Sequence, residues 1–92
     1  MGFSMFYTYI LHSQSADRFY TGYTSYTPQN RLHLHNQGST PSTKSGIPWE
    51  IQFCKSFDTK TEAIKFENFI KRQKSKVFIQ KLIDSDENEY RE

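Results

Sequence analysis

Two short apolar segments separated by a polar turn dominate the first part of the chain. Residues 6–12 are rich in aromatic and β-branched side chains and contain neither Gly nor Pro, a composition typical of a strand. Residues 13–17 are polar and turn-forming, and residues 18–23 return to a strand-like composition. The pattern therefore predicts a β-hairpin.

A helix, a loop and a third strand are predicted next. Thr27 before Pro28 is typical of an N-cap followed by proline at the first helical position, and Gly38 is a typical stop signal. Residues 37–48 are rich in small and turn-forming residues, which predicts a loop. Residues 49–57 alternate large apolar with mostly polar residues, which predicts a strand with one buried face.

Two more helices are predicted after the third strand. Thr59 and Glu62 match a capping box, which predicts a helix that ends near Gln73. Ser75 can cap a further helix, in which apolar residues recur four positions apart between residues 78 and 83. The predicted order is β-β-α-β-α-α, an α+β fold.

Charge is distributed unevenly along the 92 residues, a length that allows one domain. Residues 1–83 contain eleven Lys or Arg and five Asp or Glu, a net charge of +6, whereas residues 84–92 contain five acids and one base, a net charge of −4. We expect residues 1–83 to form the domain and residues 84–92 to form a flexible acidic tail. The basic body suggests a polyanionic partner, although many unrelated domains carry as much positive charge.

The sequence also predicts a compartment. Residues 1–6 lack the basic segment and the long apolar run of a targeting signal. The single cysteine, Cys54, lies in a strand-like segment and is expected to be a small buried side chain in a reducing compartment. We therefore expect a soluble cytoplasmic protein without a membrane partner.

Two polar residues lie where the first helix should bury its apolar face. Arg31 and His35 are four residues apart and share one face, and their directions fall between those of Leu32 and Leu34. The buried side of this helix is therefore predicted to carry an arginine and a histidine. The alternative is a short helix whose leucines flank an exposed polar stripe.

A carboxylate interrupts the apolar stripe of the second helix. Glu67 lies between Ala63 and Ile70 on the face that should be buried. A carboxylate in that position is costly unless it is paired or binds a metal. The structural alternative is an ion pair with Lys71, four residues further on.

Six short motifs carry a family resemblance in the same order along the chain. They are Tyr7-Thr8-Tyr9, Tyr20-Thr21-Gly22, Arg31, His35 with Asn36, residues 43–50, and Ala63 with Glu67 and Lys71. Together they resemble the GIY-YIG nuclease superfamily, and within it small stand-alone proteins of the UPF0213 kind. The resemblance implies a three-stranded antiparallel sheet flanked by helices, and metal-dependent hydrolysis of phosphodiester bonds in nucleic acid.

The resemblance also implies a role for each site residue. Tyr9 would activate or position the attacking water, with positive charge nearby favouring its phenolate. Arg31 would hold a phosphate oxygen, and His35 would orient the nucleophile or relay its proton. Tyr20 would join them from the neighbouring strand. Glu67 would hold one divalent cation, Mg²⁺ or Mn²⁺.

One departure from the family concerns an asparagine. Many GIY-YIG nucleases carry it downstream of the metal-binding glutamate, but the corresponding stretch here contains Gln80 and no asparagine. This departure bears on the strength of the activity rather than on the fold. The runner-up function is therefore a non-catalytic nucleic-acid-binding module with the same fold.

The expected partner is nucleic acid, with DNA favoured over RNA. A monomer or weak dimer is expected, and a protein partner could supply specificity. Five basic residues are expected to contact the sugar-phosphate backbone, although an ordinary solvated helix face would look similar. They are Lys44, Lys71, Arg72, Lys74 and Lys76.

Overall fold

Three antiparallel strands form the centre of the molecule in this computed structural model, which describes residues 5–90. They are β1 (Phe6–Ser13), β2 (Arg18–Thr24) and β3 (Trp49–Phe57), arranged in the order β2-β1-β3. The predicted hairpin is thus confirmed, and β1 is the central strand. Residues 1–4 and 91–92, which belong to the predicted domain and tail, lie outside the described residues.

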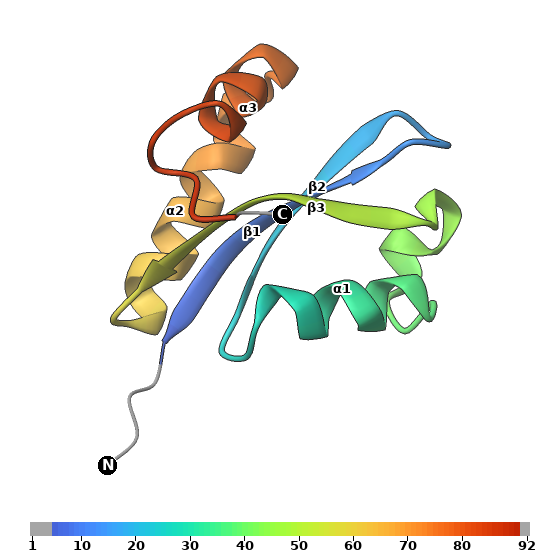
Figure 1. Cartoon of the computed structure of the whole chain (residues 1–92), viewed down its shortest axis with the longest axis horizontal. Helices are drawn as coiled ribbons and strands as arrows, with labels where there is room; N and C mark the ends of the chain where they lie inside the picture. The colour runs from blue at the N-terminus through green and yellow to red at the C-terminus, as the bar shows by residue number, and fades with distance from the viewer. Residues whose placement is uncertain (1–4, 91–92) are drawn as a thin grey trace.

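Helices cover both faces of this sheet (Figure 1). On one side lie α1 (Pro28–Asn36) and a short 3-10 helix, η1 (Pro41–Gly46); on the other lie α2 (Lys60–Gln73) and α3 (Lys76–Ile83). The α+β class and the order of the main elements are therefore confirmed. The prediction of a plain loop between α1 and β3 missed η1.

The predicted caps explain why the three longer helices begin where they do. Thr27 Oγ1 accepts a hydrogen bond from the backbone N–H of Asn30, and Ser75 Oγ accepts one from Phe78. Thr59 Oγ1 accepts from the N–H of Glu62 and its hydroxyl donates to the Glu62 carboxylate, so the N-cap half of the capping box predicted for α2 is formed. Each cap satisfies an N–H that the helix itself leaves without a partner.

The sheet separates two apolar clusters, and β3 contributes to both. Trp49 and Ile51 pack on the α1 side, whereas Phe53 packs against α2 and α3. The prediction that β3 buries one face is therefore wrong. The reason is a register shift opposite Ile10 and Leu11, which places Gln52 as an extra residue and reverses the alternation of side chains.

The acidic segment after α3 is held against the outer edge of β3. Asn88 Oδ1 accepts a hydrogen bond from Cys54 N–H, and Glu89 N–H donates to the Cys54 carbonyl at 2.8 Å. Ser56 N–H donates to the Glu89 carboxylate. The segment expected to be a flexible acidic tail is therefore bonded to β3 through Asn88 and Glu89, which satisfy backbone groups of that strand.

None of the helices in the described part of the chain is long and apolar enough to cross a membrane.

Candidate functional site

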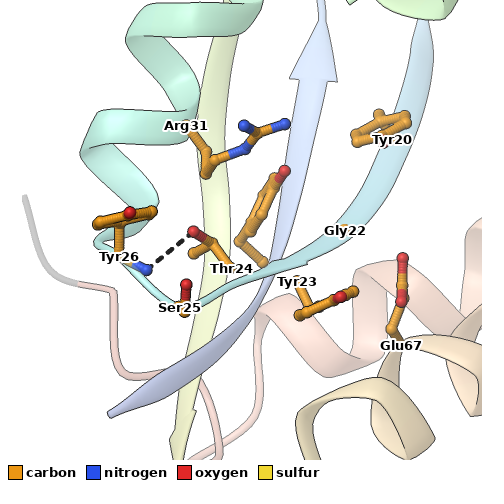
Figure 2. A pocket seen from close by; sticks show the side chains of 9 residues that line it. Tyr20, Gly22, Tyr23, Thr24, Ser25, Tyr26, Arg31 and Glu67 are labelled. Atoms are coloured by element: carbon orange, nitrogen blue, oxygen red, sulfur yellow. Dashed lines mark hydrogen bonds between the residues drawn. The ribbon is translucent and has the colours of Figure 1, made fainter. Parts of the chain in front are cut away.

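A pocket of about 390 Å³ lies beside β2, the strand at the other edge of the sheet. Its walls come from β1, β2, the loop after β2, α1 and α2 (Figure 2). Nine residues line it: Tyr9, Tyr20, Gly22, Tyr23, Thr24, Ser25, Tyr26, Arg31 and Glu67. Thr24 at the end of β2 and the loop residues Ser25 and Tyr26 had no predicted role, because their sequence shows only an ordinary turn between a strand and a capped helix.

Four of the five predicted catalytic and metal-binding residues line this pocket. Tyr9 comes from β1, Tyr20 from β2 and Arg31 from α1, while Glu67 comes from α2 on the opposite side of the sheet. Figure 2 shows Arg31 extending from α1 and Glu67 from α2, with β2 passing between them. Residues that are far apart in sequence therefore face one space.

The fifth residue, His35, lies directly behind the pocket wall. Its side chain is fully buried, and its Nε2 atom is 3.0 Å from the Tyr9 hydroxyl. Its ring also packs on Tyr20, with 4.9 Å between the ring centroids. His35 therefore contacts both tyrosines without reaching the pocket itself.

The buried side of α1 is polar, as the helical periodicity predicted. Pro28 and His35 are the buried residues of α1, whereas Leu32 and Leu34 are only partly buried. The alternative of an exposed polar stripe is therefore wrong. Arg31 is partly buried, and its Nε atom has no hydrogen-bond partner among the described residues. A buried N–H without an acceptor is costly, so this arginine is suited to receive an anion.

Gly22 provides the space that the Tyr9 hydroxyl occupies. The two residues are directly opposite each other in the β1–β2 register. A Cβ atom at Gly22 would lie 2.6 Å from Tyr9 Oη and 2.8 Å from Tyr9 Cζ. The glycine of the second motif is therefore required by the close approach of a side chain rather than by its backbone angles.

The sequence model of the GIY-YIG catalytic domain matches residues 5–82, a span that runs from β1 into α3. The chain belongs to the GIY-YIG family. Searches of curated proteins and of solved structures found no match to it. Membership makes this a domain of the nuclease type, with nucleic acid as the class of partner and divalent metal ions as the usual cofactor of the family.

Burial dominates the electrostatics of the two central residues of this GIY-YIG domain. Burial raises the pKa of the Tyr9 phenol, although the Arg31 guanidinium beside it acts in the opposite direction. Burial also lowers the pKa of His35, and the positive charge of Arg31 lowers it further. The Arg31 guanidinium therefore favours the Tyr9 phenolate as expected, but burial outweighs it and the net pKa of Tyr9 is raised.

Glu67 forms the ion pair that the sequence allowed, and it does so at the pocket. Its carboxylate accepts a hydrogen bond from Lys71 Nζ at 2.9 Å, which is the predicted ion pair, and it also lines the pocket. The Glu67 side chain is 12% exposed and that of Lys71 is 49% exposed. The carboxylate is therefore largely buried, whereas the lysine that pairs with it is half exposed.

The donor atoms around Glu67 fit one kind of metal site. The described residues contain no group of three or more His, Cys, Asp or Glu side chains that could enclose a metal ion. Mg²⁺ commonly binds proteins through one or two carboxylates and completes its shell with water and substrate phosphate. One carboxylate beside an open pocket fits that pattern, and a zinc-type site does not.

The basic residues predicted to bind nucleic acid do not form one group. Lys71 lies at the pocket, with its Nζ 5.9 Å from the centroid of the Tyr20 ring. Arg72 and Lys74 are exposed at the end of α2, while Lys76 forms an ion pair with Asp17 in the β1–β2 turn. Lys44 is exposed on η1 and does not line the pocket.

Proposed function

We propose that this GIY-YIG domain is a metal-dependent endonuclease that hydrolyses phosphodiester bonds, with DNA as its substrate. The observation that carries the proposal is the meeting of two phenols, a guanidinium and a carboxylate at one pocket. A phosphodiester needs cationic donors for its oxygens, a group that positions water and a ligand for a metal ion. The pocket offers side chains of each kind.

Arg31 is proposed to bind the scissile phosphate. Its guanidinium lines the pocket and its Nε atom lacks an acceptor among the described residues, so a phosphate oxygen would supply one. Tyr20 could donate its hydroxyl to a second oxygen of the same phosphate. Lys71, near the Tyr20 ring, adds positive charge on that side of the pocket.

Tyr9 is proposed to act as a relay rather than as a preformed phenolate. Its raised pKa keeps the phenol neutral at neutral pH. As water attacks phosphorus, the water proton would pass to Tyr9 Oη while the Tyr9 proton passes to His35 Nε2, 3.0 Å away. The new P–O bond forms as the bond to the leaving oxygen breaks, and that oxygen takes a proton from water. In a later step the proton on His35 passes back through Tyr9 Oη to solvent, which restores the neutral imidazole.

Glu67 is proposed to hold the divalent cation, Mg²⁺ or Mn²⁺. When bound, the cation would neutralise charge on the phosphate and on the leaving oxygen. Lys71 must release the carboxylate for this to occur, and its half-exposed ammonium is free to move onto a backbone phosphate.

The decisive experiment compares cleavage by the unaltered protein with cleavage by two glutamate variants. Supercoiled plasmid, single-stranded DNA and branched DNA are incubated with Mg²⁺, Mn²⁺ or chelator. Glu67→Gln keeps the shape of the side chain but removes the charge, so we expect a loss of nicking of about 100-fold or more. Glu50→Gln is the matched control, because Glu50 is exposed on β3 and outside the pocket.

Retained nicking in chelator or in Glu67→Gln would refute the proposed mechanism. The second candidate is a nucleic-acid-binding module without turnover, and the Glu67–Lys71 ion pair favours it, since a pure binder would keep its carboxylate neutralised. Salt-dependent binding without nicking under any metal would select this second candidate.

A further inference from the structure

Behind His35 lies a buried threonine for which the proposed chemistry has no role so far. Thr43 is on η1 and is 1% exposed. Its Oγ1 atom is 2.9 Å from His35 Nδ1 and 3.1 Å from the carbonyl oxygen of Thr40. The hydroxyl therefore joins the imidazole to the backbone of Thr40, the residue that precedes η1, and does so through the ring nitrogen that does not contact Tyr9.

The positions of the protons in this series of hydrogen bonds follow from what each group can donate. The Thr40 carbonyl can only accept, so the single hydroxyl proton of Thr43 points to it. Thr43 Oγ1 must then accept from His35, which places a proton on Nδ1. The opposite arrangement would leave two oxygen atoms 3.1 Å apart with no proton between them, which is repulsive.

A neutral imidazole carries one ring proton, so a proton on Nδ1 leaves a lone pair on Nε2. That lone pair faces the Tyr9 hydroxyl at 3.0 Å, and the tyrosine must be the donor. Burial and the charge of Arg31 both lower the pKa of His35, which agrees with a neutral ring. The lone pairs of Tyr9 Oη can then accept from the Arg31 guanidinium beside it and from groups in the pocket.

We propose that Thr43, anchored on the Thr40 carbonyl, is a positioning residue that holds His35 in the Nδ1–H tautomer, so that Nε2 can receive the proton of Tyr9. The catalytic consequence rests on the proposed nuclease function. The tautomer itself does not, because it follows from hydrogen bonds within the protein.

The surroundings of Thr43 keep its hydroxyl in this position. Its backbone N–H donates to the Thr40 carbonyl at 3.1 Å, and its own carbonyl accepts from Trp49 Nε1 at 2.8 Å. Trp49 is in turn held by Asn36, whose side chain bonds both its N–H and its carbonyl. Residues of α1, η1 and β3 thus hold one hydroxyl group in place behind the histidine.

The first test reads the tautomer directly, without any activity measurement. Long-range ¹H–¹⁵N correlation spectra of the ¹⁵N-labelled protein distinguish protonated from unprotonated imidazole nitrogens. Variants His12→Gln and His33→Gln, which alter residues outside the pocket, assign the signals of His35 by elimination. We expect His35 to show a protonated Nδ1 and an unprotonated Nε2 at pH 8. A protonated Nε2 in the unaltered protein would overturn the proposal.

The second test removes the hydroxyl. Thr43→Val has nearly the same shape but cannot accept from Nδ1, whereas Thr43→Ser keeps the hydroxyl and is the matched control. We expect Thr43→Val to shift His35 toward the Nε2–H tautomer and to lower kcat by about 10- to 100-fold with KM unchanged. We expect Thr43→Ser to retain both the tautomer and the rate.

The outcomes separate this proposal from the proposed nuclease function. An unchanged His35 tautomer in folded Thr43→Val overturns the role of Thr43, even if the protein is an active nuclease. The expected tautomers in a protein that cleaves nothing support the role of Thr43 and refute the nuclease. If Thr43→Val does not fold, the spectra of the unaltered protein and of Thr43→Ser still decide the tautomer.

Discussion

Replacing Gly22 with alanine adds one methyl group at the closest contact of the candidate site. The new Cβ would lie 2.6 Å from Tyr9 Oη, whereas ordinary contact begins near 3.4 Å. The phenol must therefore shift by the difference, 0.8 Å. Tyr9 is 1% exposed, so its ring can move only by displacing other core residues.

The expected cost combines two opposing effects. Overpacking a well-packed core costs about 1–3 kcal/mol, while alanine in place of a strand glycine recovers about 0.5–1 kcal/mol. A net loss on the order of 1–2 kcal/mol corresponds to a fall in Tm of about 4–16 °C for a domain of this size. The Tyr9–His35 hydrogen bond is 3.0 Å long and is lost beyond about 3.5 Å. A shift of this size is therefore larger than the displacement that the bond can tolerate. Cleavage should therefore fall as well.

Thermal unfolding and plasmid nicking measure the two effects separately. Gly38→Ala is the control, because Gly38 has φ +81° and lies outside the pocket. Alanine there is strained by about 1–2 kcal/mol, so stability should fall to a similar extent while nicking in the folded protein is retained.

A double-mutant cycle identifies the clash as the cause. Tyr9→Phe removes the atom closest to the new methyl group, so Gly22→Ala should destabilise the Tyr9→Phe protein less than the unaltered protein. Equal effects in both backgrounds, or a Gly22→Ala protein with unchanged or higher Tm, would refute the steric argument.

Three further predictions address charge. The pKa of His35 is lowered in the folded protein, so the unfolded chain binds more protons than the folded one as pH falls below about 6.5. The urea midpoint of the unaltered protein should therefore drop in that range, whereas the midpoint of His35→Asn should not. The lowered pKa of Asp17 acts in a separate, more acidic range. Lys71→Met should raise the affinity of the free protein for Mn²⁺ by about 2- to 5-fold in a calorimetric titration, because the ammonium competes for the Glu67 carboxylate; unchanged affinity would contradict this competition. Arg72→Gln should reduce the salt dependence of DNA binding by about 0.9 in the log–log slope if Arg72 contacts phosphate, and an unchanged slope would mark it as a solvated surface residue.

The elements could be predicted from the sequence because their signals are local. Thr27, Thr59 and Ser75 each bond to an N–H three residues further on, so the pattern that predicts the cap also forms it. The register shift at Gln52 and the binding of Asn88 to β3 depend on residues distant in sequence. Neither feature can therefore be predicted from the residues that are its neighbours in sequence.

In the candidate site, too, only the features with a local sequence signal could be predicted. Helical periodicity placed Arg31 and His35 on the buried face, because both lie on one helix. Thr43 begins one of the six motifs, but its role could not be recognised, because its partner His35 belongs to another element. The direction of the Tyr9 pKa shift depends on burial outweighing a nearby arginine, a balance that only the folded arrangement determines.

The attachment of the acidic segment to β3 leaves the two borders of the sheet unequal. Along β3, the backbone groups of Cys54 and Ser56 are already bonded to Asn88 and Glu89. A strand with free backbone groups is a template for pairing with another polypeptide. Chains that lack this segment would gain a second such template. With this segment bonded to β3, the other border of the sheet is β2, and a polypeptide that paired there would lie beside the pocket that substrate must enter.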